Sequence, residues 1–241
     1  MRCQDDHAGE PAERDVGRLS AAAIESAVKG SLSRLGVDRI DPYYAHIDNR
    51  ATPLDETVRA FGRLAADGIV DLVGCSNTAA WRLERARRLA ADHGVEPYSV
   101  IQQQYTYLWP SPLAQPGVRF LGAPHYRQVS VEHLDYLTEH RDVTLVGHMA
   151  LLGGAYARTD RPLPADRGYA HPSGYVRFEE LRRVARELGA TPNQVVLAWM
   201  LHQDPVVIPL FGASTVAQLD EALEAVEIRL DADTLDRLDN A

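Results

Sequence analysis

The chain has 241 residues, enough to bury the core of one large α/β domain without help from a disulfide or a metal. Its net charge of −9 excludes a basic nucleic-acid-binding face, because phosphate recognition needs clustered Lys and Arg, and the arginines here are interleaved with Asp and Glu. No apolar run reaches the roughly 20 residues of a membrane-spanning helix, and two cysteines provide neither a disulfide framework nor a zinc-ligand spacing. We therefore expect a cytoplasmic protein whose partner is a small-molecule substrate.

The elements predicted along the chain alternate between helix and strand. Residues 1–18 are polar and aperiodic, which predicts a mobile leader before one domain spanning residues 19–241. Helices are predicted at 20–36, 54–68, 79–94, 131–140, 177–189, 191–203, 215–227 and from 231 onward, and strands at 39–46, 69–76, 98–105, 143–149 and 206–212. This alternation predicts a parallel sheet with helical crossovers, since parallel neighbours need a long connection.

Two long segments rich in Pro, Gly and aromatic residues interrupt this order. They span residues 106–129 and 153–175, and loops of this length in a compact domain are usually functional or mobile. The aromatic run YTYLWP, which includes Trp109, and the nearby Tyr126 either line a substrate pocket or pack as an ordinary loop, and the sequence favours neither.

Six segments carry a resemblance to a known family. They read SLSRLGVDRIDPYYAHID, GIVDLVGCSN, VIQQQY, GG at 153 and 154, GATPNQVVLAWML and VIPLFGASTVAQLDEAL. In this order the set resembles the aldo-keto reductase family. The resemblance implies an eight-stranded parallel (β/α) barrel of TIM type, of which this chain holds about five strands. It also implies reduction of an aldehyde or ketone by NADPH, with a Tyr, Lys, Asp and His tetrad.

The resemblance also implies roles for individual residues. His46, at a predicted strand end, matches the tetrad histidine, and barrel enzymes place reactive groups at such ends. Ser76, Asn77 and Gln102 match residues that hold the nicotinamide carboxamide, and His148 stands where a tyrosine stacks on the nicotinamide ring. The residues implied at the adenosine end and its phosphates are Gly212, Ser214, Thr215, Gln218 and Glu221.

This chain departs from the family at the cofactor and at the tetrad. The usual basic residue for the 2′-phosphate is missing after Gly212, and Ala222 replaces an asparagine that reads adenine, so the cofactor is NADP, NAD or none. The Asp, Tyr and Lys of the tetrad have no counterpart, because Lys29 is the only lysine and lies within the first predicted helix, on the outside of the barrel. We interpret the chain as a truncated or divergent member.

Three functions therefore stay open. The first is carbonyl reduction dependent on NADH or NADPH. The second is a non-redox dehydratase, isomerase or cyclase that uses His46, and the third is an inactive binding or regulatory subunit. Because a barrel that lacks strands has open edges and an uncovered face, we expect a homo-oligomer or a partner protein to cover them.

Several polar residues have a simpler interpretation beside the functional one. His46 could be a plain polar strand end, and Asp48 either pairs with it or is a solvated loop carboxylate, which is the interpretation we favour. Ser76 and Asn77 could form a turn and cap the next helix. Cys75 is expected to be a buried hydrophobe. The remaining pair is His133 and His140, for which a surface helix is favoured over a metal site, so no metal is predicted.

Overall fold

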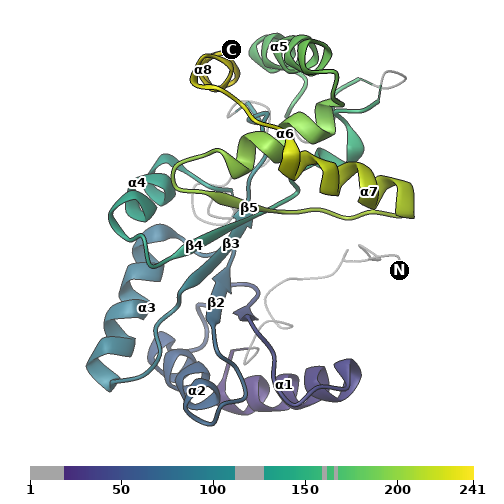
Figure 1. Ribbon diagram of the computed structural model, residues 1–241. Coiled ribbons are helices and arrows are strands. Elements are labelled where there is room, and N and C mark those ends of the chain that lie inside the picture. Colours follow the sequence, from purple (N-terminus) through teal and green to yellow (C-terminus); the bar gives the residue numbers. More distant parts are fainter. Residues whose placement is uncertain (1–18, 112–127, 159–161, 166–167) are drawn as a thin grey trace. The chain divides into compact units, whose positions relative to one another are not determined.

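The computed structural model describes residues 19–111, 128–158, 162–165 and 168–241 (Figure 1). The predicted leader, most of the first long loop and Tyr126 lie outside the described residues. The chain divides into two compact units, Met1–Val100 and Ile101–Ala241. The single domain predicted for residues 19–241 stays a prediction.

The first unit alternates helices and strands as predicted. Its elements are α1 (Ala21–Leu35), β1 (Tyr43–Ala45), α2 (Leu54–Ala66), β2 (Val73–Ser76) and α3 (Ala80–His93). The side chain of Ser20 caps α1 by accepting from the backbone N–H of Ala23, and Gly36 ends the helix in the left-handed conformation. β1 pairs in parallel with β2, with Ala45 opposite Cys75.

Aromatic rings and a close strand contact form the core of this unit. Phe61 of α2 is buried, and its ring centroid lies 5.8 Å from that of Tyr43 and 5.9 Å from that of Tyr98. Gly74 of β2 allows Tyr44 to pack on it, because a Cβ at position 74 would lie 2.6 Å from the Tyr44 ring. The residues that pack around β1 and β2 are therefore constrained by the volume of their side chains as well as by their hydrophobicity.

The second unit contains the remaining elements. They are β3 (Val100–Gln104), which begins at the unit boundary, α4 (Val131–Glu139), β4 (Thr144–His148), η2 (Leu152–Gly154), α5 (Pro172–Leu188), α6 (Pro192–Leu201), β5 (Val207–Leu210), α7 (Val216–Glu224), η3 (Ala225–Glu227) and α8 (Ala232–Asp239). β4 pairs in parallel with β5, with His148 opposite Leu210. Five strands are thus present in the described residues, and the predicted parallel α/β architecture is confirmed.

Three predicted starts are wrong by four residues or more. The strands β1 and β2 begin at Tyr43 and Val73, each four residues after the predicted start. Helix α5 begins at Pro172, five residues before the predicted start, so the long loop predicted to end at Tyr175 is shorter. The His171 side chain accepts from the N–H of Gly174. Pro172 occupies the first helical position, where a backbone N–H would have no partner within the helix, so the missing N–H of proline costs nothing. This cap outweighs the loop-like composition of the segment.

The aromatic run after β3 belongs to the core of this unit. Tyr105 stacks on Trp199 of α6 at 5.4 Å, and Tyr107 meets the same indole edge-on at 5.3 Å. The Tyr107 hydroxyl donates to the backbone oxygen of Leu238. Ordinary packing is therefore the correct interpretation for Tyr105 and Tyr107, whereas Trp109 is 38% exposed.

Large apolar side chains are exposed on β5 and α7. Val206, Ile208 and Leu210 are exposed in and beside the strand. The helix carries an exposed stripe made of Val216, Leu219 and Leu223, which Val226 of η3 continues. The expectation that a second copy or a partner covers such surfaces stays a prediction. Among the described residues, no helix has both the length and the apolar character that crossing a membrane requires.

Candidate functional site

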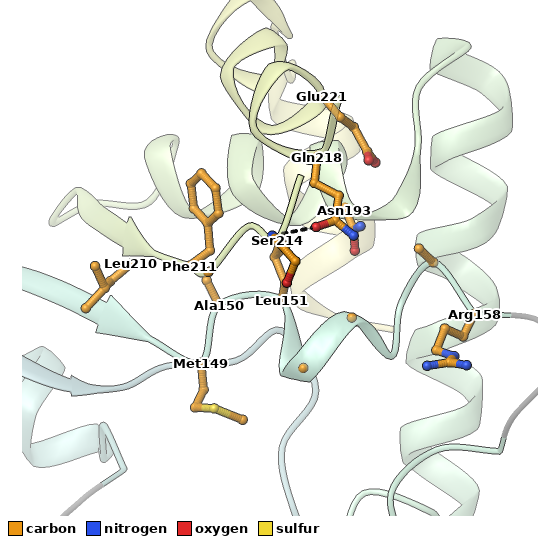
Figure 2. A pocket seen from close by; sticks show the side chains of 14 residues that line it. Met149, Ala150, Leu151, Arg158, Asn193, Leu210, Phe211, Ser214, Gln218 and Glu221 are labelled. Atoms are coloured by element: carbon orange, nitrogen blue, oxygen red, sulfur yellow. Dashed lines mark hydrogen bonds between the residues drawn. The ribbon is translucent and has the colours of Figure 1, made fainter. Parts of the chain in front are cut away.

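The second unit holds a pocket of about 550 Å³, within the range of small-molecule sites (Figure 2). Three parts of the chain line it: residues 149–158 after β4, residues 210–221 from the end of β5 into α7, and Asn193 of α6. Two of these segments follow strands of a parallel pair, so they meet where an open α/β sheet usually binds ligands.

The segment after β4 forms one side of the pocket in a constrained backbone conformation. Met149 and Leu152 have φ values of 61° and 49°, which side chains with a Cβ rarely adopt, and Gly153 and Gly154 also have positive φ. Backbone strain of this kind concentrates at functional sites, where the surrounding structure maintains it.

The start of α7 forms a second side of the pocket. The Thr215 side chain caps the helix by accepting from the N–H of Gln218 at 3.2 Å. The Gln218 side chain in turn accepts from the N–H of Ser214 at 2.7 Å, the contact drawn in Figure 2. A capped helix N-terminus directs N–H groups and a partial positive charge outward, which favours anions.

Contacts from α6 hold the acidic part of the pocket. The Thr191 hydroxyl donates to Glu221 at 2.6 Å, and Gln194 donates to the backbone oxygen of Glu221 at 3.1 Å. Asn193 lies between these two residues in the sequence, and its Oδ1 atom is buried without a hydrogen-bond partner. An acceptor left in this state normally costs stability unless a ligand or water satisfies it.

Arg158 gives the pocket its positive charge. It is the one basic residue among those that line the pocket, and Figure 2 shows it well apart from Gln218 and Glu221. The pocket therefore combines a guanidinium on one side with a carboxylate and carboxamides on the other. That arrangement suits a ligand with an anionic part and a hydrogen-bond-donating part.

The structure gathers most of the residues that the resemblance implied for the adenosine end. Gly212, Ser214, Gln218 and Glu221 line the pocket, and Thr215 caps its helix. The lining residues include neither Gln102, half-buried in β3, nor His148, whose backbone oxygen accepts from Tyr105.

Sequence reasoning missed two lining residues that carry polar chemistry. They are Arg158 and Asn193. Arg158 follows the paired glycines, and Asn193 stands in the capping segment TPNQ. Neither position carries a motif that distinguishes it from a solvated surface residue.

The remaining predicted residues lie together in the first unit. His46 directly follows β1 and is exposed, whereas Ser76 ends β2 and is buried. The Asn77 side chain donates to the backbone oxygen of His46 and to the Ser76 hydroxyl, both at 2.9 Å. The predicted capping role is wrong, because α3 has Ala79 at its N-cap and no side-chain cap there.

Both interpretations of Asp48 are wrong. Its side chain is only 5% exposed, and it forms an ion pair with the equally buried Arg82 at 2.5 Å and a second pair with the exposed Arg50. A carboxylate removed from water needs a paired cation, and Arg82 of α3 takes the place proposed for His46.

Cys75 and the two histidines of α4 have structural surroundings. Cys75 is buried, as predicted, and burial raises the pKa of its thiol to about 12. His133 is not a surface residue: it is 3% exposed, accepts from the N–H of Ser130 and lies 3.0 Å from the Gln103 amide. The described residues contain no group of three side chains suited to binding a metal.

Comparison with known proteins gives a consistent result. The model of the aldo/keto reductase family matches residues 11–241. The chain is 32% identical over 228 residues to the uncharacterized oxidoreductase YrpG of Bacillus subtilis, covering 94% of this chain and 65% of that protein. It is 30% identical to the aldo-keto reductase str7 of Strobilurus tenacellus, covering 83% of this chain and 57% of that protein.

A third relative and a solved structure extend the comparison. The chain is 27% identical to a putative voltage-gated potassium channel subunit beta of Schizosaccharomyces pombe, covering 92% of this chain and 64% of that protein. A crystal structure of a thermostable aldo-keto reductase with the inhibitor epalrestat superposes with a TM-score of 0.69 at 25% identity, covering 92% of this chain and 67% of that one.

These matches settle the family and the fold class while covering only part of the relatives. The chain spans 57% to 65% of the length of these curated relatives. The structural likeness confirms the predicted fold class, of which the described residues contain five strands. The chain belongs to the aldo/keto reductase family.

Proposed function

We propose that this chain binds a nicotinamide dinucleotide in the pocket of the second unit and serves the reduction of an aldehyde or ketone. The observation that carries the proposal is the pocket itself, about 550 Å³ in volume, whose lining combines the Arg158 guanidinium with the start of α7 and its acceptor groups. Family membership supplies the reaction class, and the oxidoreductase names of the relatives agree with it.

The residues present fit a dinucleotide. Phosphate groups favour cations and the partial positive charge of a helix N-terminus, which Arg158 and the first turn of α7 supply. Hydroxyl and amino groups need acceptors, and the buried Oδ1 of Asn193 is an acceptor that lacks a donor. Arg158, Ser214 and Gln218 would therefore hold the cofactor, which supplies the hydride when it is bound.

The choice between NADH and NADPH follows from charge. Residues 203–228 include five Asp or Glu and no Lys or Arg. A 2′-phosphate beside α7 would therefore lack a local cation and would lie near the carboxylate of Glu221. We propose NADH as the preferred cofactor.

Apart from the pocket, membership of the family assigns a role in carbonyl reduction to His46 of the first unit. His46 is exposed directly after β1. Asn77 bonds to its backbone oxygen and not to its imidazole. It would orient the carbonyl oxygen by a hydrogen bond. Burial raises the pKa of Tyr44, Tyr98 and Tyr105, so these hydroxyls hold their protons instead of acting as tuned acids.

Equilibrium titration tests the cofactor proposal before any turnover is measured. The fluorescence of bound NADH and NADPH should report saturable binding below millimolar concentration, with NADH the tighter ligand. Oxidation of NADH at 340 nm in the presence of an aromatic aldehyde then tests hydride transfer. The absence of binding by either nucleotide at millimolar concentration would contradict the proposal, whereas binding without turnover would limit it to the cofactor.

A further inference from the structure

The loop after β1 carries an exposed guanidinium whose charge is only partly balanced. Asp48 is the one acidic residue in segments 46–53 and 77–83, whereas Arg50 and Arg82 are both basic. The Asp48 side chain is 5% exposed, and it pairs through one oxygen with the buried Arg82 and through the other with Arg50. One carboxylate therefore serves two cations. Because the buried pair neutralises itself, the surplus positive charge lies on Arg50, whose side chain is 51% exposed.

An exposed aromatic ring lies against this cation. Trp81, in the first turn of α3, is 52% exposed, and the Arg50 guanidinium lies over its ring at 5.0 Å from the centroid. Arg50 donates to Asp48 through Nε, and within the described part of the chain it has no other hydrogen bond or ion pair. The N–H donors of its two Nη groups are therefore available to a ligand.

The same loop carries the histidine to which family membership assigns a role in carbonyl reduction. His46 is exposed and stands four residues before Arg50, so the backbone between them spans at most about 14 Å. The loop is held from beneath at two points: Asn77 donates to the His46 backbone oxygen at 2.9 Å, and Arg82 holds Asp48. The cation and the histidine therefore belong to one anchored segment.

The chemistry of this surface indicates the kind of ligand that it suits. A guanidinium with unused N–H donors binds a carboxylate through two parallel hydrogen bonds, and an exposed indole stacks on another aromatic ring. One surplus positive charge matches a monoanion better than a phosphate group, which carries about −1.5 to −2 near neutral pH. The matching ligand is an aromatic carboxylate.

We propose that Arg50 and Trp81 select the substrate, and that the substrate class is an aromatic aldehyde or ketone that also carries a carboxylate. Arg50 binds the carboxylate and Trp81 stacks on the ring. The carboxylate takes no part in the reduction, which adds a hydride to the carbonyl carbon and a proton to its oxygen. The inference rests on the proposed function, since it names the substrate class of that reaction.

The test follows the indole N–H signal of Trp81 by NMR, with 4-formylbenzoate and its neutral methyl ester as probes. The chain has three tryptophans, so the spectrum of Trp81→Phe identifies the signal. We expect the wild type to bind 4-formylbenzoate about tenfold more tightly than the ester, because only the anion gains charge-assisted hydrogen bonds. Arg50→Gln should bind 4-formylbenzoate about tenfold more weakly and the ester almost unchanged.

Two further variants separate a specific contact from an effect of net charge. Arg88→Gln removes the same charge from the exposed face of α3, where Arg88 pairs with Glu84, and should leave both dissociation constants unchanged. Arg50→Lys keeps the cation without the planar fork and should retain part of the preference for the anion. Equal binding of anion and ester by the wild type would overturn the inference, as would equal losses in Arg50→Gln and Arg88→Gln or an unmoved Trp81 signal.

A separate NADH titration distinguishes this inference from the proposed function. If NADH binds but 4-formylbenzoate does not shift the Trp81 signal, the substrate class is wrong and the cofactor proposal stands. If NADH does not bind, the proposed function is refuted, and the assignment of 4-formylbenzoate as a substrate fails with it, whatever the NMR titration shows.

Discussion

The two units treat their polar side chains in opposite ways. In the first unit, Asp48 and Arg82 neutralise each other in the interior, and the Asn77 amide donates to the backbone oxygen of His46. In the second unit, Asn193 lines an open pocket, and its Oδ1 atom has no hydrogen-bond partner among the described residues. Polar groups that satisfy one another stabilise a fold, whereas polar groups with remaining hydrogen-bonding capacity are available to a ligand.

The comparison also separates two kinds of constrained backbone. Asn77 has a φ of 53° and its side chain bonds within its own unit, so local contacts account for its conformation. Met149 and Leu152 have similar φ values without the side-chain amide that favours this region, and the segment they belong to lines the pocket. Strain beside a cavity is therefore the stronger sign of a ligand site.

The largest expected effect is on stability in the first unit. Arg82→Met leaves Asp48 buried with only the exposed Arg50 as a partner, and it should lower the free energy of unfolding by about 3 kcal/mol in urea titrations. Arg88→Met removes a surface pair with Glu84 and should cost under about 1 kcal/mol. Equal losses for both variants would show that the buried pair has no special weight.

The next effect is on ligand binding in the second unit. Arg158→Ala removes the one cation of the pocket lining and should raise the dissociation constant of NADH about tenfold. Arg186→Ala changes an exposed arginine of α5 outside this lining and serves as the control. If the two variants bind NADH equally, the phosphates do not lie near Arg158.

A smaller effect is expected from adding a charge at the start of α7. Ser214→Arg introduces a cation at an exposed position of the lining, where the sequence has no basic residue nearby. It should improve NADPH binding relative to NADH by about fivefold to tenfold, because the 2′-phosphate gains a charged partner. Ser173→Arg, at the start of α5, is the matched control, and the same gain there would indicate a nonspecific charge effect.

The smallest effect is expected at His46. Its side chain is exposed, and Asn77 contacts only its backbone oxygen, so His46→Ala should change the free energy of unfolding by under about 0.5 kcal/mol. Asn77→Ala, which removes two hydrogen bonds, should cost more. Urea titrations of the two variants test this order, and a larger loss at His46 would mean that its imidazole supports the fold.

Local chemistry explains why much of the fold was predictable. Ser20 and Gly36 delimit α1, and Thr191 with Pro192 starts α6, because caps act within one turn of the helix. The start of α5 was missed because the cap at His171 lies in a segment with the composition of a loop. A histidine cap followed by proline is a local signal, but it is weaker than Ser, Thr or Asp.

The candidate site was predictable only where a motif covers one continuous stretch. The segment from Gly212 to Glu221 follows β5 and runs through the start of α7, so one local motif brought four lining residues together. His148 belongs to a different strand end, and its absence from the lining depends on how the segment after β4 turns.

By itself, the sequence determined the order of helices and strands, the family and the stretch of chain that forms one side of the pocket. These depend on periodicity, caps and motifs, which act over a few neighbouring residues. Only the tertiary structure decided that Asp48 pairs with Arg82 and that Asn193 is left without a donor. Burial removes water from the polar groups of both sites. The groups that take the place of water come from residues about 30 positions away in the sequence.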